Sequence, residues 1–346
     1  MKRISLVLLF AAIIVIFVGL LADPSFTAIA AQEDTTLNAA RVSTDVSDPL
    51  AGAWNDVSAL TVSLTPQTED SKLPTVAGIH YGAIPEVKLQ ASYDDKTIWV
   101  RAVWADGTIG DSRNTWVFDG KTWAKNGQDQ DRLAFVFDIT GNAQFQALGC
   151  GAVCHKADAS ASDYMGFPVA NSTDAVDIWQ WKASQTGPAN YADDQWLGSY
   201  IDDNGPKAPV SDASTGTATV ANSNKAGDGP AFAYPTGTQP GGPLFADSAV
   251  PFDATATLPT GYAVSGYVVS RPGGSRGDIN AQAVHLTYTD GTGWWYVVVS
   301  RPFDTGNQDD HVFTLNSSSV FGVAVFNNSG DKGHATSNKL MLDIGS

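Results

Sequence analysis

One short segment of the sequence carries residues whose types and spacing suit covalent chemistry. It reads Gly-Cys-Gly-Ala-Val-Cys-His from Gly149 to His155, and its two thiols, Cys150 and Cys154, are the two cysteines of the chain. Neighbouring thiols can add to the two vinyl groups of a haem, and a histidine directly after the second thiol then lies beside the iron. The segment therefore predicts one haem c, attached through Cys150 and Cys154, with His155 as an axial ligand.

The spacing within this segment leaves a second interpretation open. A c-type haem usually has two residues between its cysteines, whereas three stand here, and a flexible Gly151 can absorb the extra length. In an oxidising compartment the same thiols can instead form a Cys150–Cys154 disulfide, with His155 as a bystander. A zinc site is the weakest interpretation, because zinc takes four ligands and the segment offers three.

The second axial position of a haem iron has several candidates elsewhere in the chain. They are Met165, ten residues after His155, and the histidines His80, His285, His311 and His334. His285 lies in an alternating segment and is expected to be an ordinary strand residue, whereas His311 follows two aspartates and is expected to be solvated. A Met ligand raises the reduction potential and a second His lowers it, so the choice affects function.

Most of the elements that must position these residues are predicted to be strands. Residues 86–93 alternate with a period of two, and 97–104 are rich in β-branched and aromatic residues, so Asp94-Asp95-Lys96 is expected to turn a hairpin. Further strands are expected over Arg132–Ile139, Tyr262–Val269, Ala281–Tyr288, Trp294–Ser300 and Val320–Phe326. The one helical candidate is Thr173–Ser184. The sequence thus predicts an all-β fold, a β-sandwich with long loops and little helix.

Two further features of this sequence need an assignment. Trp179 and Trp181 are expected to wall a haem pocket, bind sugar or pack in the core, and these alternatives stay open. Residues 202–250 are rich in Gly, Pro, Ser, Thr and Asn, so they are expected to form a polar insertion without a core of their own. We expect a single domain over residues 48–346 that contains this insertion.

The N-terminal residues have the pattern of an export segment. Lys2 and Arg3 precede an apolar run over residues 4–22, and Ala28-Ile29-Ala30-Ala31 offers a cleavage site. Residues 1–31 are therefore expected to be a signal peptide or an uncleaved membrane anchor, and residues 32–47 a tether. Both outcomes place the remaining chain on the periplasmic or extracellular face of the membrane.

Composition and charge exclude some functions. The formal net charge is -16, which would repel phosphate, so nucleic acid is not expected as a partner. The sequence contains no recognisable Ser/His/Asp set, paired catalytic carboxylates or phosphate-binding glycine loop. No catalytic residues are therefore expected, and the haem segment favours an electron carrier over an enzyme.

With these residues in view, the chain resembles the ethylbenzene dehydrogenase-related haem-binding family, which includes the haem subunits of molybdenum dehydrogenases and related c-type cytochromes. The resemblance covers roughly residues 48–345 and rests on several segments in order. They are Asp48–Asp56, Leu89–Trp104, Gln130–Phe137, Gly149–His155, Asp177–Ala183 (with Gln180 where the family commonly has His), Gly274–Asp278 and Phe321–Gly330.

The resemblance implies a β-sandwich related to carbohydrate-binding modules, and in its c-type branch the three-residue spacing between the cysteines is common. Another branch holds a b-type haem through a Met and a Lys. The position of that Met, near Phe135–Phe137, has no Met here, and the Gly-rich turn that carries the Lys has His334. The resemblance therefore implies His155 and His334 as the axial pair, with Met165 as the alternative to His334.

Two functions from different classes follow. The first is an exported c-type cytochrome, either free-standing or the haem subunit of a molybdenum oxidoreductase. Its partners would be redox proteins, such as molybdopterin and iron–sulfur subunits or another cytochrome. The second is a haem-free carbohydrate- or ligand-binding β-sandwich module with a Cys150–Cys154 disulfide.

Overall fold

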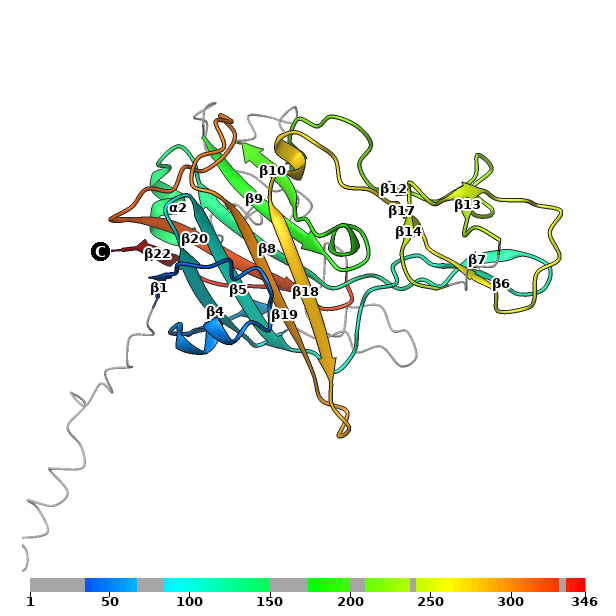
Figure 1. Cartoon of the computed structure of the whole chain (residues 1–346), viewed down its shortest axis with the longest axis horizontal. Coiled ribbons are helices and arrows are strands. Elements are labelled where there is room, and N and C mark those ends of the chain that lie inside the picture. Colours follow the sequence, from blue (N-terminus) through cyan, green and yellow to red (C-terminus); the bar gives the residue numbers. More distant parts are fainter. Residues whose placement is uncertain are drawn as a thin grey trace, which may run out of the picture. The chain divides into compact units, whose positions relative to one another are not determined.

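β-Strands dominate the computed structural model, which describes residues 35–66, 84–149, 174–198, 209–236, 241–329 and 334–345 (Figure 1). One sheet contains fourteen of the described strands. Its continuous path runs through β11 (Val210–Ser211), β10 (Asp193–Gly198), β9 (Ala175–Lys182), β8 (Arg132–Asp138), β20 (Ser317–Phe326), β22 (Leu340–Ile344), β1 (Thr36–Arg41), β4 (Glu86–Tyr93), β5 (Thr97–Ala105), β19 (Gly293–Pro302) and β18 (Asn280–Thr287). Off this path, β2 (Leu60–Ser63) pairs with β4, while β21 (His334–Thr336) pairs with β20 and with β3 (Thr65–Pro66).

The two halves of this sheet face each other as the layers of a β-sandwich. Figure 1 shows β4, β5, β19 and β18 side by side in one layer, with β8, β9, β10 and β20 in the other. Apolar side chains from both halves form one buried cluster, in which Trp181 of β9 meets Trp104 of β5 and Trp295 of β19 edge-on. We call the sheet face that contacts this cluster the inner face, and the opposite face the outer face. The expected all-β sandwich is confirmed.

The hairpin expected around residues 94–96 is confirmed. β4 and β5 pair in antiparallel register, with Tyr93 opposite Ile98. The Asp94 carboxylate accepts hydrogen bonds from the backbone N–H groups of Lys96 at 2.8 Å and Thr97 at 2.7 Å. An aspartate that bonds the backbone two and three residues on closes a tight turn, which is why the sequence pattern was sufficient here.

The helix expected over Thr173–Ser184 is wrong, because residues 175–182 form strand β9. Its partners in the sheet are β8 and β10, with Phe135 opposite Trp179. Apolar side chains on this strand lie on both faces: Trp179 points into the inner core, while Ile178 belongs to a second cluster on the outer face. Burial on both faces hides the period-two polarity that identifies a half-exposed strand.

The tether expected over residues 32–47 is wrong where the structure describes it. Residues 36–41 form β1, which pairs in parallel with β22 on one side and β4 on the other. Leu37 is the residue of this strand that enters the inner core. Backbone pairing with two neighbours places the segment in the sheet, and such pairing leaves little trace in side-chain polarity.

The polar insertion expected around residues 202–250 contains more structure than its composition indicates. Small sheets are formed by β12 (Val220–Ala221), β14 (Leu244–Phe245) and β17 (Tyr267–Val269), by β13 (Phe232–Ala233) and β15 (Val250–Pro251), and by β6 (Trp116–Phe118), β7 (Trp123–Lys125) and β16 (Ala263–Val264). They share a core of Trp116, Tyr234, Leu244, Val264 and Val268. Tyr234 and Leu244 come from the insertion, and residues before and after it complete this core.

The strand expected over Tyr262–Val269 is interrupted at Gly266, and its halves join different sheets as β16 and β17. A side-chain carbon at Gly266 would lie 2.3 Å from the backbone oxygen of Asn114, so this close approach requires glycine.

Helices are short in the described part of the chain. They comprise α2 (Ala143–Leu148) and the 3-10 turns η1 (Gly52–Asp56), η5 (Gly187–Ala189) and η7 (Ser275–Gly277). None of the helices among the described residues has the length and apolarity to cross a membrane. The predicted export segment, residues 1–31, lies outside the described residues.

Candidate functional site

The structure describes only part of the expected haem site. Cys150, Cys154, His155 and Met165 lie outside the described residues, as does His80. The described part contains both ends of the loop that carries them, together with the strand that begins at His334.

The loop leaves the outer face through α2 and returns to it at β9. Phe145 of α2 is fully buried in the outer-face cluster with Val136 and Ile178. Asn142 caps the helix by accepting hydrogen bonds at 2.9 Å from the backbone of the first turn, and its amide donates to Asp174 at 2.6 Å. Because Asn142 precedes the loop and Asp174 follows it, this bond joins the two ends.

Gly149 ends the helix and places the start of the cysteine segment beside another strand connection. Its φ of 65° is in the left-handed region, and a side-chain carbon there would lie 2.6 Å from Cα of Lys339. Lys339 belongs to the short link between β21 and β22. A glycine is therefore required both for the backbone angle and for the close approach.

His334 opens β21 and lies on the outer face. It pairs with Phe326 of β20, and the two rings stack with centroids 4.6 Å apart. Only 8% of His334 is exposed. Its neighbour Ala335 points the opposite way, into the inner core, which is the alternation that a strand imposes.

Small side chains flank this histidine on the outer face. Ala134 and Ala324 lie opposite each other on β8 and β20 and form a small buried cluster with Phe326. Arg132 is opposite Phe326 in the same register, and its guanidinium lies 5.7 Å from the ring centroid. The result is a buried apolar cluster beside an imidazole, bordered by the guanidinium of Arg132.

This set of residues fits a flat apolar group that needs an axial nitrogen ligand. Imidazole is a regular iron ligand, and the two alanines beside it present small apolar side chains. The donor chemistry of His334 and its apolar surroundings are therefore compatible with the haem that the sequence predicts.

The other described histidines are engaged at both ring nitrogens. His285 bonds the backbone oxygen of Asp106 at 2.9 Å and the hydroxyl of Thr287 at 3.2 Å. His311 bonds the backbone oxygen of Asp138 at 2.6 Å and the hydroxyl of Ser319 at 2.8 Å. These bonds remove both histidines as candidates for the second iron ligand.

The expectation that His311 is solvated is wrong. Its ring stacks on Phe137 with centroids 5.6 Å apart, and burial lowers its pKa. The turn that holds it folds back onto the sandwich, a long-range contact that the local Asp-Asp-His pattern does not reveal.

The structure decides between the alternatives for Trp179 and Trp181. Both are almost completely buried, at 0% and 1% exposure, and both belong to the inner core. They are therefore core residues, and neither presents a ring face on which a sugar could stack.

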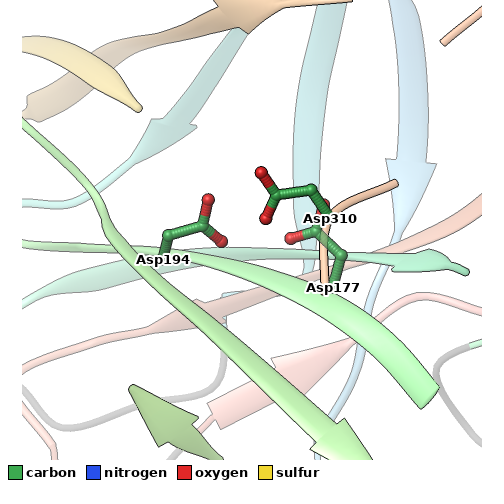
Figure 2. Close-up of side chains that lie close together, drawn as sticks. All are labelled: Asp177, Asp194 and Asp310. Atoms are coloured by element: carbon green, nitrogen blue, oxygen red, sulfur yellow. The ribbon is translucent and has the colours of Figure 1, made fainter. Parts of the chain in front are cut away.

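A buried polar cluster lies on the inner face, with residues from β9, β10 and β19. The sequence patterns did not predict it. Arg301 is fully buried and its Nη1 lies 2.9 Å from Asp177, 3.3 Å from Asp194 and 3.5 Å from Asp310 (Figure 2 shows the three carboxylates). Burial and mutual repulsion raise the pKa of Asp177 and, more strongly, that of Asp194. Although burial alone would lower it, the pKa of Arg301 is raised by these carboxylates. Aspartates within apolar or aromatic segments could have indicated buried charges. Their positions in the sequence do not show that they lie together, because they are far apart along the chain.

Comparison with known proteins gives one match that covers most of the chain and several weak structural likenesses. A solved putative carbohydrate-binding protein from Bacteroides uniformis aligns over 90% of this chain and 99% of its own, with a TM-score of 0.37 and 9% identity. A carbohydrate-binding module of family 9 from Caldicellulosiruptor kristjanssonii, solved with glucose, aligns over 90% and 96%, with a TM-score of 0.34 and 8% identity. Likenesses of this size carry no conclusion about function.

No curated protein matches the sequence. The profile of the family described as ethylbenzene dehydrogenase matches residues 51–337, from the first 3-10 turn to the residue after β21. Most of the sandwich lies within this match, including His334 and the loop with both cysteines. The chain therefore belongs to the ethylbenzene dehydrogenase family.

Proposed function

We propose that this protein is an exported c-type cytochrome that carries electrons for an oxidoreductase through one covalently bound haem. Cys150 and Cys154 would attach the haem, while His155 and His334 would bind the iron. The haem supplies one-electron redox chemistry when bound, and the protein contributes its ligands and its surroundings.

One contact carries this proposal. Gly149, the residue before Cys150, lies against Lys339, which follows His334 by five residues. Five extended residues span at most about 18 Å. The attachment segment therefore begins within reach of the histidine that the family resemblance selects, although nearly two hundred residues separate them in the sequence.

The role of His334 would be to hold its imidazole at the outer face and to keep water from it. Stacking on Phe326 restricts the ring, and the strand pairing of β20 with β21 sets its direction. Two histidine ligands favour a lower reduction potential than a His/Met pair would.

The family assignment supports work within a multisubunit enzyme, so the proposed partners are molybdopterin and iron–sulfur subunits or another cytochrome. The net charge of -16 favours docking to a basic surface and fast, salt-dependent association. Residues 1–31 would export the chain and would be its one contact with the membrane. This protein would then have no catalytic residues of its own.

Attachment is tested by expression in a host that matures c-type cytochromes. We expect the intact mass to include one haem and the Soret absorbance to stay with the protein after extraction with acid and acetone. Cys150→Ala and Cys154→Ala singly should leave one thioether, and the double variant should lose covalent haem. A mass without haem, two hydrogens short because of a Cys150–Cys154 disulfide, would favour the haem-free binding module instead.

The second axial ligand is tested by comparing four variants of the haem protein. His334→Ala should convert low-spin iron to high-spin, whereas His285→Ala should leave the spectrum unchanged. His334→Met should restore low-spin iron at a higher potential. If Met165→Ala produces the high-spin form while His334→Ala does not, Met165 is the ligand and the assignment of His334 is wrong.

A further inference from the structure

The acidic cluster around Arg301 extends beyond the three aspartates that contact this arginine. It brings together carboxylates from β9, β10 and the segments around β11, β18 and β19, namely Asp177, Asp194, Asp212, Asp278, Asp309 and Asp310. These residues are remote from one another in the sequence, so folding alone gathers them. None of them has a part in the proposed haem site.

The positions of the carboxylates form two overlapping groups. Asp177, Asp194 and Asp310 each offer an oxygen within 4.8 Å of the others, and so do Asp212, Asp309 and Asp310. Figure 2 shows the first group, with the carboxyl group of Asp194 directed toward those of Asp177 and Asp310. Because Asp310 belongs to both groups, the two groups adjoin each other.

Several of these oxygens are buried without a hydrogen-bond partner. Asp177 and Asp194 are both fully buried, and each uses Oδ2 to accept from Arg301 while its Oδ1 has no partner. Asp212 is 5% exposed and likewise leaves its Oδ1 unpartnered. Buried carboxylate oxygens carry a large desolvation cost, so unpartnered ones indicate that something else binds them.

The neighbouring cations do not balance this cluster. Within the described residues, Arg301 is the cation that forms ion pairs with it. Arg276 comes near Asp212, but its guanidinium donates to Asp193 on the other face. The ring nitrogens of His311 bond the backbone oxygen of Asp138 and the hydroxyl of Ser319, so neither of them pairs with a carboxylate of the cluster.

We propose that this cluster binds a calcium ion. Its donors are all oxygens, which hard cations prefer, and it contains no free imidazole or thiolate of the kind that zinc selects. Calcium accepts six to eight oxygen ligands in irregular geometry, whereas magnesium keeps several waters and is served by one or two carboxylates. A buried site with many carboxylates therefore suits calcium better.

The electrostatics of the cluster agree with this assignment. Burial, then repulsion by Asp309 and Asp310, raises the pKa of Asp212 to about 8, and burial and Asp310 raise that of Asp278 to about 6. A divalent ion would supply the missing positive charge directly.

Calcium binding is tested on the full exported chain, with or without haem, after treatment with EGTA and dialysis. Calcium alone should bind with a Kd of about 1 mM or tighter and raise Tm by about 5 °C at saturation, while equimolar magnesium should have a smaller effect. Terbium offers an independent probe, because Trp179 packs 4.8 Å from the guanidinium of Arg301 and should sensitise its emission.

Two variants show whether this cluster is the site. Asp194→Asn and Asp212→Asn should each weaken calcium binding at least tenfold, and both should fold because they remove repulsion. Asp253→Asn, at an exposed turn, is the matched control and should keep the full response. The proposal is overturned if calcium neither shifts the Tm of the wild-type protein nor gives a binding signal in isothermal titration calorimetry. It is also overturned if Asp194→Asn and Asp212→Asn bind calcium as tightly as Asp253→Asn does.

Discussion

Asp193 and Asp194 are neighbours on β10 but lie on opposite faces of the sheet, and their surroundings differ in charge balance. On the outer face, Asp193 pairs with two cations, Lys182 at 2.6 Å and Arg276 at 2.6 Å. On the inner side, Asp194 shares the single Arg301 with two other aspartates. Both carboxylates are almost fully buried.

Their pKa values move in opposite directions as a result. Burial raises the pKa of each carboxyl group, but at Asp193 the charges of Lys182 and Arg276 outweigh burial and lower it. At Asp194 the charge of Asp177 adds to burial, and the pKa rises well above its usual range. Burial therefore does not decide the ionisation of these aspartates, because both are buried. The number of cations per carboxylate decides it.

The largest expected effect is that of Arg301→Met. It would leave the inner carboxylates without their cation, and removing one partner of a buried ion pair costs about 3–5 kcal/mol. We expect the free energy of unfolding, measured in urea with EGTA present, to fall by about 4 kcal/mol. A loss below about 1 kcal/mol would show that the inner carboxylates are already neutral and do not need the arginine.

Asp193→Asn should have the next largest effect. It would leave Lys182 and Arg276 without a carboxylate in a buried setting, so we expect a loss of about 3 kcal/mol in urea unfolding. Lys182→Met is the informative control, because Asp193 would keep Arg276. If Lys182→Met lowers the free energy of unfolding by more than Asp193→Asn does, the carboxylate of Asp193 is not what stabilises the two cations.

Asp194→Asn should behave differently from Asp193→Asn, although the residues are adjacent and the chemical change is identical. It would remove one negative charge from a crowded cluster while Asp177 and Asp310 still pair with Arg301. In EGTA we expect unchanged stability or a gain of up to about 1 kcal/mol. Equal losses in the two variants would remove the distinction between the faces.

The smallest effect is expected at the exposed ion pair of Arg41 with Asp95. Both side chains are more than half exposed, so water and salt screen their attraction. Asp95→Asn should change the free energy of unfolding by less than about 0.5 kcal/mol. A larger change in thermal or urea unfolding would mean that exposure does not weaken ion pairs in this fold.

The sequence predicted the fold best where local patterns and pairing agree. The β4–β5 hairpin was found because alternation flanks a turn that Asp94 closes with its own side chain. β9 was mistaken for a helix because both of its faces are buried. β1 was missed because two partner strands hold it through its backbone.

What the sequence determined by itself is chemistry of short range. Cys150, Cys154 and His155 stand within six residues, so their possible reaction with a haem can be read without a fold. Family membership likewise follows from motifs in order along the chain.

Only the tertiary structure decided which distant groups share a site. Asp177 and Arg301 are 124 residues apart and meet at 2.9 Å, and Gly149 contacts Lys339 across an even longer separation in the sequence. The physical reason is that sheet pairing is non-local: the order of the strands in space differs from their order in the chain. Which carboxylates meet which cations inside the sandwich depends on that order, so it cannot be read from the spacing of residues along the chain.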